Sequence, residues 1–407
     1  MNVGTWIVCS LARREAGLPS TAHALFERMP EPVWWIDHPL SWKDAAGNPG
    51  AWHGWPRHAR VRSGPGWPRP DVDLHEGAPR PGDLHLVTPS PAPVHALPDA
   101  LFDRFTSWHA RSTARWLTRR LAGAPRPHVL WNAFDVAWGT LLARHLPHDL
   151  LVHHAYDDLA SARHAARHGL RLEPELLARA DLVVTTSPAL LAAHSGHPGV
   201  HLVTNGVDFE RFAGAPGWPD PLEDWPRPRI GFVGHLEDRL DVEMLLAAAC
   251  ERPGWSWILV GPVHPAARDR LAPLLALPQV AWLGPRPAFE VPRLLAALDV
   301  GLLPFVSSAQ TRAVYPLKLH EYLAAGLPVV ATPFADLPGA EPVVHRVREG
   351  DLVGAVEQAL GAHDEVDRAR RQGVARQADW SVRVRQVRDL VEEALAARHA
   401  PRAERAP

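Results

Sequence analysis

A lysine and a glutamate one helical turn apart, Lys318 and Glu321, form the pair in this sequence with the clearest chemistry. They lie in the segment YPLKLHEYLAAGLPVVA, residues 315–331. Pro316 suits the first position of a helix, and Gly326 suits the left-handed residue that ends one. The beginning of such a helix offers unpaired N–H groups to an anion. A lysine beside phosphate and a carboxylate that accepts two ribose hydroxyls together predict a site for a nucleoside diphosphate.

The composition makes this lysine unusual. Of the 43 basic residues only Lys43 and Lys318 are lysines, and proline accounts for 42 of the 407 residues. We interpret both biases as the mark of a GC-rich genome, and a lysine retained against that background draws attention to its position.

The elements that must position these residues follow a βα rhythm, which is typical of parallel sheets. We predict an α/β fold of two doubly wound, Rossmann-like domains facing a central cleft, the default ligand site. The expected boundaries are a first domain at 1–205, a Pro/Gly-rich linker at 206–229, a second domain at 230–380, an amphipathic helix at 381–398 and a flexible tail at 399–407.

Length, charge and cysteine content exclude several classes of protein. A chain of 407 residues with 46% hydrophobic residues has room for two cores. Its net charge of −2 argues against binding to duplex nucleic acid. We expect no signal peptide, because the first residues lack a basic leader and a long apolar run. The two cysteines, far apart in sequence, suggest free thiols in a reducing compartment, which fits a cytoplasmic enzyme.

Several segments resemble those of retaining glycosyltransferases of family 4 (glycosyl transferases group 1), which have the GT-B fold. The segment 315–331 is most similar to the teichuronic-acid and exopolysaccharide-type subgroup with a P-x-K-x-x-E-Y pattern. The other segments that carry the resemblance, in the family's order, are LARADLVVTTS at 177–187, VTNGVDFERF at 203–212, IGFVGHL at 230–236 and LDVGLLPF at 298–305. The resemblance is specific from Leu177 to Val330 and weak before it.

The resemblance implies that 1–205 is the acceptor-side domain, that 230–380 binds the nucleotide sugar, and that the helix at 381–398 crosses back to the first domain. It also implies roles for single residues. Glu321 matches the second glutamate of the family's E-x7-E motif, which binds the ribose, whereas Ala313 stands where the first would be. Lys318 and the amides around Leu317 are the expected diphosphate contacts. Arg239, with His235 second, is the nearest basic residue in the glycine loop that begins at Gly234. The base is expected against the loop at Gly284–Arg286.

The acceptor side has a candidate in the sequence HHAYDD at 153–158. Because related transferases often carry two aspartates here, we name Asp157 and Asp158, with His154 behind them, as catalytic candidates. Aspartate is also a favoured helix cap, which explains the same pair almost as well. Arg13 and Arg14, after the first strand, are further candidates for contact with the donor phosphate or the acceptor.

Two further patterns have simpler explanations. Asp71 and Asp73 resemble a metal-binding D-x-D, but they lie in a Pro-rich stretch, and GT-B enzymes do not generally need a metal. The histidines include His145, His148, His153 and His154. These four include no i, i+4 pair, and no thiolate cluster supports a zinc site, so we expect no metal and no other cofactor.

Residues 99–121 form an amphipathic, basic stretch. It suits a helix that covers the sheet, and it also suits peripheral contact with the inner face of the plasma membrane, near a glycan or lipid-linked acceptor.

We therefore expect a metal-independent hexosyltransferase that moves a sugar from a nucleoside-diphosphate donor to an acceptor hydroxyl with retention, in the synthesis of a cell-surface polysaccharide or glycoconjugate. Two alternatives stay open: a degenerate nucleotide-sugar-binding subunit without turnover, suggested by Ala313, and a nucleotide-sugar epimerase on the same fold. A dehydrogenase is disfavoured because neither half has G-x-G-x-x-G after its first strand.

Overall fold

The computed structural model describes residues 2–12, 20–41, 45–46, 57–62, 83–92, 97–214, 220–362 and 364–399. The chain divides into two compact units. Unit 1 comprises residues 1–203 together with 383–407, and unit 2 comprises residues 204–382. Arg13, Arg14, Asp71, Asp73 and the tail after His399 lie outside the described residues. Among the helices of the described ranges, none combines the length and apolar character needed to cross a bilayer.

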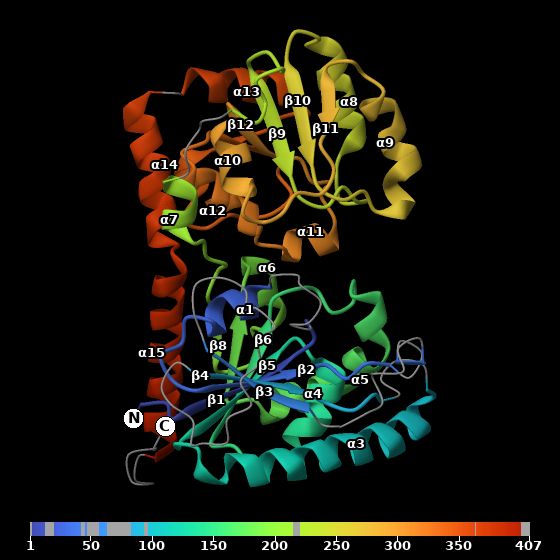
Figure 1. The fold of residues 1–407 in the computed structure, drawn as a ribbon, viewed down its shortest axis with the longest axis vertical. Helices are drawn as coiled ribbons and strands as arrows, with labels where there is room; N and C mark the ends of the chain where they lie inside the picture. Colours follow the sequence, from blue (N-terminus) through green and yellow to red (C-terminus); the bar gives the residue numbers. More distant parts are fainter. Residues whose placement is uncertain are drawn as a thin grey trace. The chain divides into compact units, whose positions relative to one another are not determined.

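Unit 1 is built on a sheet in the order β3-β4-β2-β1-β5-β6-β7-β8 (Figure 1). Every neighbouring pair is parallel except β3 and β4, which are antiparallel. The strands are β1 (Thr5–Ser10), β2 (Val33–Asp37), β3 (Arg57–Arg62), β4 (Asp83–Thr88), β5 (His128–Ala133), β6 (Leu150–Ala155), β7 (Leu182–Thr185) and β8 (Val200–Leu202).

Alternate residues of these strands feed two cores, because successive side chains of a strand point to opposite faces. Trp6 and Val8 of β1 join one cluster, while Ile7 and Cys9 join the other. The helices that supply the covering layers are α1 (Thr21–Phe26), α3 (Asp99–Arg120), α4 (Val136–Ala143), α5 (Arg163–Arg179), α6 (Pro188–Ala193) and α15 (Trp380–His399). Both faces of the sheet are therefore buried, as in other doubly wound folds.

Unit 2 is built on a wholly parallel sheet in the order β11-β10-β9-β12-β13-β14. Its strands are β9 (Arg229–Val233), β10 (Ser256–Val260), β11 (Val280–Trp282), β12 (Val300–Leu303), β13 (Val329–Ala331) and β14 (Val344–Arg346). Its helices are α7 (Phe209–Ala213), α8 (Val242–Glu251), α9 (Arg268–Leu275), α10 (Val291–Ala296), α11 (Ala309–Ala313), α12 (Leu317–Ala324), α13 (Leu352–Gly361) and α14 (Glu365–Gln377). The predicted pair of doubly wound α/β domains is confirmed.

The segment expected as a linker, 206–229, belongs instead to unit 2. Phe209 and Phe212 of α7, and Leu222 after it, are buried in that unit's core. The high Pro and Gly content indicates a connection, but the three apolar side chains anchor the described parts of the segment, 206–214 and 220–229, against the domain.

The C-terminal residues 383–407 are counted with unit 1. Val384, Val387, Val391 and Leu395 form the buried stripe of α15, in the same cluster as Trp6 and the other residues on that face of the sheet. Arg388 adds a hydrogen bond to Glu31, 2.9 Å from Nε to Oε1.

Candidate functional site

Three glycines follow the carboxyl ends of neighbouring strands in unit 2, namely Gly234 after β9, Gly261 after β10 and Gly284 beyond β11. The amide of Gly261 donates to the carbonyl of Gly284 at 2.8 Å. A Cβ added at Gly261 would lie 2.0 Å from the carbonyl oxygen of Gly234, and its φ of +133° also favours glycine. Bare backbone therefore lines this edge of the sheet, where parallel α/β sheets bind ligands.

Lys318 reaches this edge from the first turn of α12. A Cβ at Gly234 would lie 2.0 Å from Cε and 2.7 Å from Nζ of Lys318, so the lysine occupies the space that the glycine leaves. Its Nζ also lies 5.9 Å from the centroid of the Phe232 ring. The ammonium group is therefore located where β9 ends and α12 begins.

The beginning of α12 has a positive electrostatic end. The cap residue Pro316 provides no side-chain hydrogen bond to the first turn, which includes Leu317 and Lys318. The first N–H groups of a helix have no intrahelical partners, and together they carry about half a positive charge. This end of α12 and the Lys318 ammonium therefore make one cationic region that can receive an anion.

Glu321 lies one turn further along α12, half-buried like Lys318. Burial raises the pKa of Glu321, and the charges of Lys318 and Arg211 oppose that rise. Burial lowers the pKa of Lys318, the Glu321 carboxylate raises it, and Arg239 lowers it further. Lys318 and Glu321 therefore stabilise each other in an environment that disfavours charge.

Arg239 is the next positive group at this site. Its Nε donates to Oε1 of Glu237 at 2.9 Å, and its carbonyl accepts the amide of Val306 at 2.9 Å. The guanidinium of Arg239 is half-buried and paired with Glu237, so its position is fixed rather than free in solvent. An incoming anion would compete with Glu237 for it.

The remaining predicted residues of unit 2 lie along the same strand ends but make fewer contacts. His235 is exposed, directly after Gly234. Arg286 is also exposed, with its guanidinium 3.9 Å from the Glu290 carboxylate. The structure thus brings Lys318 close to Gly234, Glu321 and Arg239. His235 and Arg286 lie nearer to solvent.

Contacts behind α12 hold it in place, and sequence reasoning missed their roles. The Asn205 amide donates to the carbonyl of Tyr315 at 2.6 Å, just before the helix. The hydroxyl of Tyr322 accepts the amide of Val233, the last residue of β9, at 2.9 Å. Arg211 of α7 is exposed and acts on Glu321 through its charge. Asn205 and Arg211 both belong to the segment 203–212, so that motif was the available signal.

Ala313 closes α11, where it is buried with 5% of its surface exposed. The position that the family fills with its first glutamate therefore has no carboxylate here, and the side chain is part of the core of the domain.

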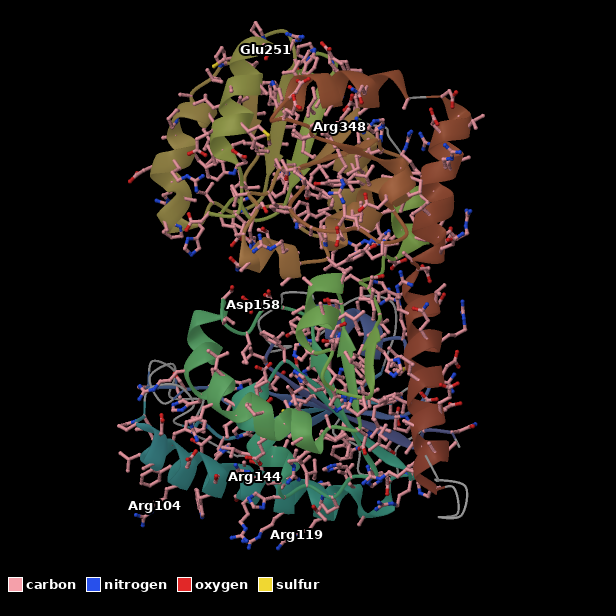
Figure 2. All side chains as sticks on the ribbon, turned by 180° about the vertical axis from the view of Figure 1, so that it is seen from behind. Arg104, Arg119, Arg144, Asp158, Glu251 and Arg348 are labelled. Carbon is pink, nitrogen blue, oxygen red and sulfur yellow. The ribbon has the colours of Figure 1, made fainter. Side chains whose placement is uncertain are left out.

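On unit 1, the structure separates the three catalytic candidates. His154 is 2% exposed, with its ring against Trp131 and Tyr156, and burial lowers its pKa to about 3. This corrects the expectation for His154, because a side chain enclosed within the sheet layer cannot contact an acceptor. Asp158, labelled in Figure 2, accepts the Ala160 amide at 3.2 Å and the Ser161 hydroxyl, so it braces the loop between β6 and α5.

Asp157 is half-buried, and its carboxylate accepts the amide of Asp158 at 2.8 Å. A second acidic group lies close by, because the charges of Asp157 and Asp135 both raise the pKa of Tyr156. Asp135 in turn is 2.8 Å from Nδ1 of His38, at the ends of β5 and β2. Sequence reasoning missed this histidine–carboxylate pair, because its members are far apart in the chain.

Helix α3 has one buried and one exposed side. Phe102, Ala110, Ala114 and Leu117 pack into the core. Trp108 is 70% exposed, and Phe105 beside it is also exposed. Arg104 and Arg119 point outward from the same helix (Figure 2). The helix therefore covers the sheet, as one interpretation predicted, and still presents basic and aromatic groups to solvent.

Residues 227–363 match the family described as glycosyl transferases group 1. TuaH of Bacillus subtilis (strain 168), named for a glycosyltransferase role in teichuronic acid biosynthesis, is 35% identical over 231 residues. That alignment spans 53% of this chain and 57% of the relative, so the chain covers little more than half of the relative's length.

Solved structures similar to the whole chain show its fold. Alr3699/HepE from Anabaena, in complex with UDP and glucose, has a TM-score of 0.63 at 15% identity and covers 95% of this chain and 99% of its own. An α,α-trehalose-phosphate synthase (UDP-forming) from Burkholderia vietnamiensis has a TM-score of 0.64 at 16% identity, over 98% and 100% of the two chains. The catalytic domain of starch synthase IV from Arabidopsis thaliana, bound to ADP and acarbose, has a TM-score of 0.61 at 12% identity, over 97% and 100%.

Proposed function

We propose that the protein transfers a hexosyl group from a nucleoside-diphosphate donor to an acceptor hydroxyl, with retention. The match of residues 227–363 to the glycosyl transferases group 1 family and the GT-B fold of the chain support this proposal. The proposal places the donor at the carboxyl edge of the unit 2 sheet. The observation that carries it is the Lys318 ammonium, which rests on Gly234 at the beginning of α12.

In this proposal different residues of α12 bind different parts of the donor. Lys318 and the amides around Leu317 bind the diphosphate, and Glu321 accepts hydrogen bonds from the ribose. The base lies toward Gly284 and Arg286. His235 and Arg239 flank the diphosphate from the loop after β9.

The chemistry follows from the charge that develops at the diphosphate. As the bond between the sugar and the diphosphate breaks, negative charge builds on the leaving oxygen. The helix end, Lys318 and Arg239 stabilise that charge more than they stabilise the ground state, which lowers the barrier. We propose that these groups neutralise the leaving group without a bound metal ion. The leaving phosphate helps to deprotonate the acceptor on the same face, which retains the configuration of the sugar.

On the acceptor side we propose Asp157 as the group that orients the acceptor hydroxyl, with the His38–Asp135 pair near it. The relationship to TuaH supports a role in the synthesis of a cell-surface polysaccharide. The exposed basic and aromatic face of α3 supports peripheral contact with an anionic membrane on its cytoplasmic side, where a lipid-linked acceptor would be found. The free state of Cys9 and Cys250 fits that reducing compartment.

The experiment is a melting-temperature screen with UDP, GDP, ADP and their sugars, followed by a measurement of donor hydrolysis and transfer. A ligand that binds the folded state raises the melting temperature by mass action. We expect one nucleotide to stabilise the wild type and not Glu321→Ala. Failure of every nucleotide diphosphate to stabilise the wild type would contradict the proposal.

A second function is favoured by one observation, the buried Ala313 in place of the family's first glutamate. In this second function the protein is a nucleotide-sugar-binding subunit without turnover. Binding of the donor with neither hydrolysis nor transfer, across a broad panel of acceptors, would support this function over the enzyme.

A further inference from the structure

Three side chains of unit 1 that are distant in sequence come together beside strand β6. They are His153 of β6, Glu173 of α5 and His194, which follows α6. One ligand atom of each lies within 4.8 Å of the other two. The distance from Nε2 of His194 to Oε1 of Glu173 is 3.5 Å. Two imidazoles and a carboxylate thus face one small volume.

His153 is the unusual member of this group. It is 1% exposed, and neither ring nitrogen makes a hydrogen bond of good geometry among the described residues, although the backbone of Asn132 lies near enough to raise its pKa slightly against the effect of burial. A buried polar group without a partner is costly, and such groups in native proteins usually have an explanation such as an unseen ion or water. Burial, with the nearby charge of His194, lowers the pKa of His153 to about 3, so its ring is neutral at physiological pH. The neutral ring is the form that ligates metals.

His194 is already oriented as metal-binding histidines are. Its Nδ1 lies 2.8 Å from the carbonyl oxygen of Leu190, which fixes the ring and leaves Nε2 facing Glu173. Histidine ligands typically donate their second ring N–H to such an oxygen. His197, also near His153, is engaged elsewhere, because Nε2 lies 3.0 Å from the Ala180 carbonyl and Nδ1 accepts the Gly199 amide at 3.1 Å.

We propose that His153, Glu173 and His194 bind one Zn²⁺ ion, with a water molecule in the fourth position. Two nitrogens and a carboxylate oxygen are a ligand set that zinc accepts in tetrahedral geometry, at about 2.0–2.2 Å each. At such bond lengths neighbouring ligand atoms are roughly 3.4 Å apart, close to the 3.5 Å between His194 and Glu173. The ion ties α5 and α6 to β6 and satisfies the orphaned ring of His153. In its absence Nε2 of His194 lies 3.5 Å from the Glu173 carboxylate, which raises the pKa of His194.

This site could not be found by spacing. Each ligand comes from a different element, so the three ligands include no i, i+4 histidine pair, and the sequence alone predicted no metal. The proposal concerns the structure of unit 1 and is independent of sugar transfer, so it stands or falls separately from the proposed function.

The test uses the full chain without a histidine tag, stripped of metal with a chelator. Zn²⁺ is titrated against a chromophoric competitor, which separates a tight site from weak binding by the other 22 of the 24 histidines. We expect one tight equivalent per chain. Co²⁺ in the same site should give the intense visible absorption of tetrahedral cobalt.

Two variants and a matched control assign the ligands. Glu173→Gln and His194→Gln should each weaken Zn²⁺ binding at least tenfold, and both positions are only half-buried, so the fold should tolerate them. The control is Glu175→Gln on the same helix, because that carboxylate binds Arg144 and not the cluster. Zn²⁺ should raise the melting temperature of the wild type and Glu175→Gln, and not that of Glu173→Gln.

The wild-type titration alone can overturn the proposal, whatever the variants do. Absence of a stoichiometric tight site would do so, as would octahedral Co²⁺ spectra. Equal loss of affinity in Glu173→Gln and Glu175→Gln would also remove these three residues as the ligands.

Discussion

A methyl group at Gly234 should displace Lys318 and weaken nucleotide binding without unfolding the protein. The Cβ of Gly234→Ala would lie 2.0 Å from Cε of Lys318, far inside van der Waals contact. The nearest atoms belong to the end of a flexible side chain, so the lysine can move away, and the φ of +158° at Gly234 adds some backbone strain for alanine. The ammonium would then leave the end of β9.

The size of the effect follows from the contact that is lost. A hydrogen bond to a charged group contributes about 1.5–3 kcal/mol. Since about 1.4 kcal/mol corresponds to a tenfold change in affinity, Gly234→Ala should raise the Kd for UDP roughly 10- to 150-fold. Lys318→Ala should give an effect of the same size.

The assay is calorimetric titration of UDP, or of whichever nucleotide the screen selects, into both single variants and the double variant. Because Gly234→Ala acts through Lys318, the double variant should bind no worse than Lys318→Ala alone. Gly254→Ala is the matched control, since a Cβ there meets no atom within 4 Å. An unchanged Kd in Gly234→Ala, or fully additive losses in the double variant, would refute this reasoning.

Three further outcomes are expected. Glu321→Gln should make the free energy of unfolding less dependent on pH. Burial raises the pKa of Glu321, so the folded state loses stability as the pH rises above the ordinary carboxyl pKa and this group must ionise. Urea titrations at pH 4 to 8 should show that decline in the wild type and not in the glutamine variant. Tyr322→Phe should lower the free energy of unfolding by about 1–3 kcal/mol, because it leaves the buried Val233 amide without its acceptor, and an unchanged urea midpoint would contradict this. Asp158→Ala should lower the melting temperature by removing the acceptor of the Ala160 amide and the Ser161 hydroxyl, and full stability with lost transfer activity would instead indicate a catalytic role.

Much of unit 2 could be predicted because its signals are local. The helix at α12 has a proline at its beginning and a glycine after its end, and the adjoining strands are short apolar runs between such breakers. The structure begins the helix at Leu317 and ends it at Ala324, within one residue at each end of the range expected from those two signals.

The errors came from features that depend on tertiary contacts. Pro and Gly content predicts a linker at 206–229, whereas Phe209, Phe212 and Leu222 of its described parts are buried in the core of unit 2. The position of His154 in a strand was expected, but which neighbours enclose its ring depends on register between strands.

Polar groups gathered from several elements were the least accessible to sequence reasoning. The His38–Asp135 pair joins the ends of two strands, and the cluster around His153 joins a strand and two helices. No spacing rule links such residues, because the chain between them can have any length that the fold accommodates.

Because residues 383–407 complete unit 1, the two halves of the chain cannot mature in the order in which they are synthesised. On the ribosome, the first 203 residues emerge long before Val384, Val387, Val391 and Leu395 are available to cover their side of the sheet. The unit formed by residues 204–382 has all of its own chain beforehand. During synthesis the amino-terminal half therefore has an uncovered apolar face until α15 emerges. A nascent chain released before residue 383 would keep that face exposed to chaperones and proteases.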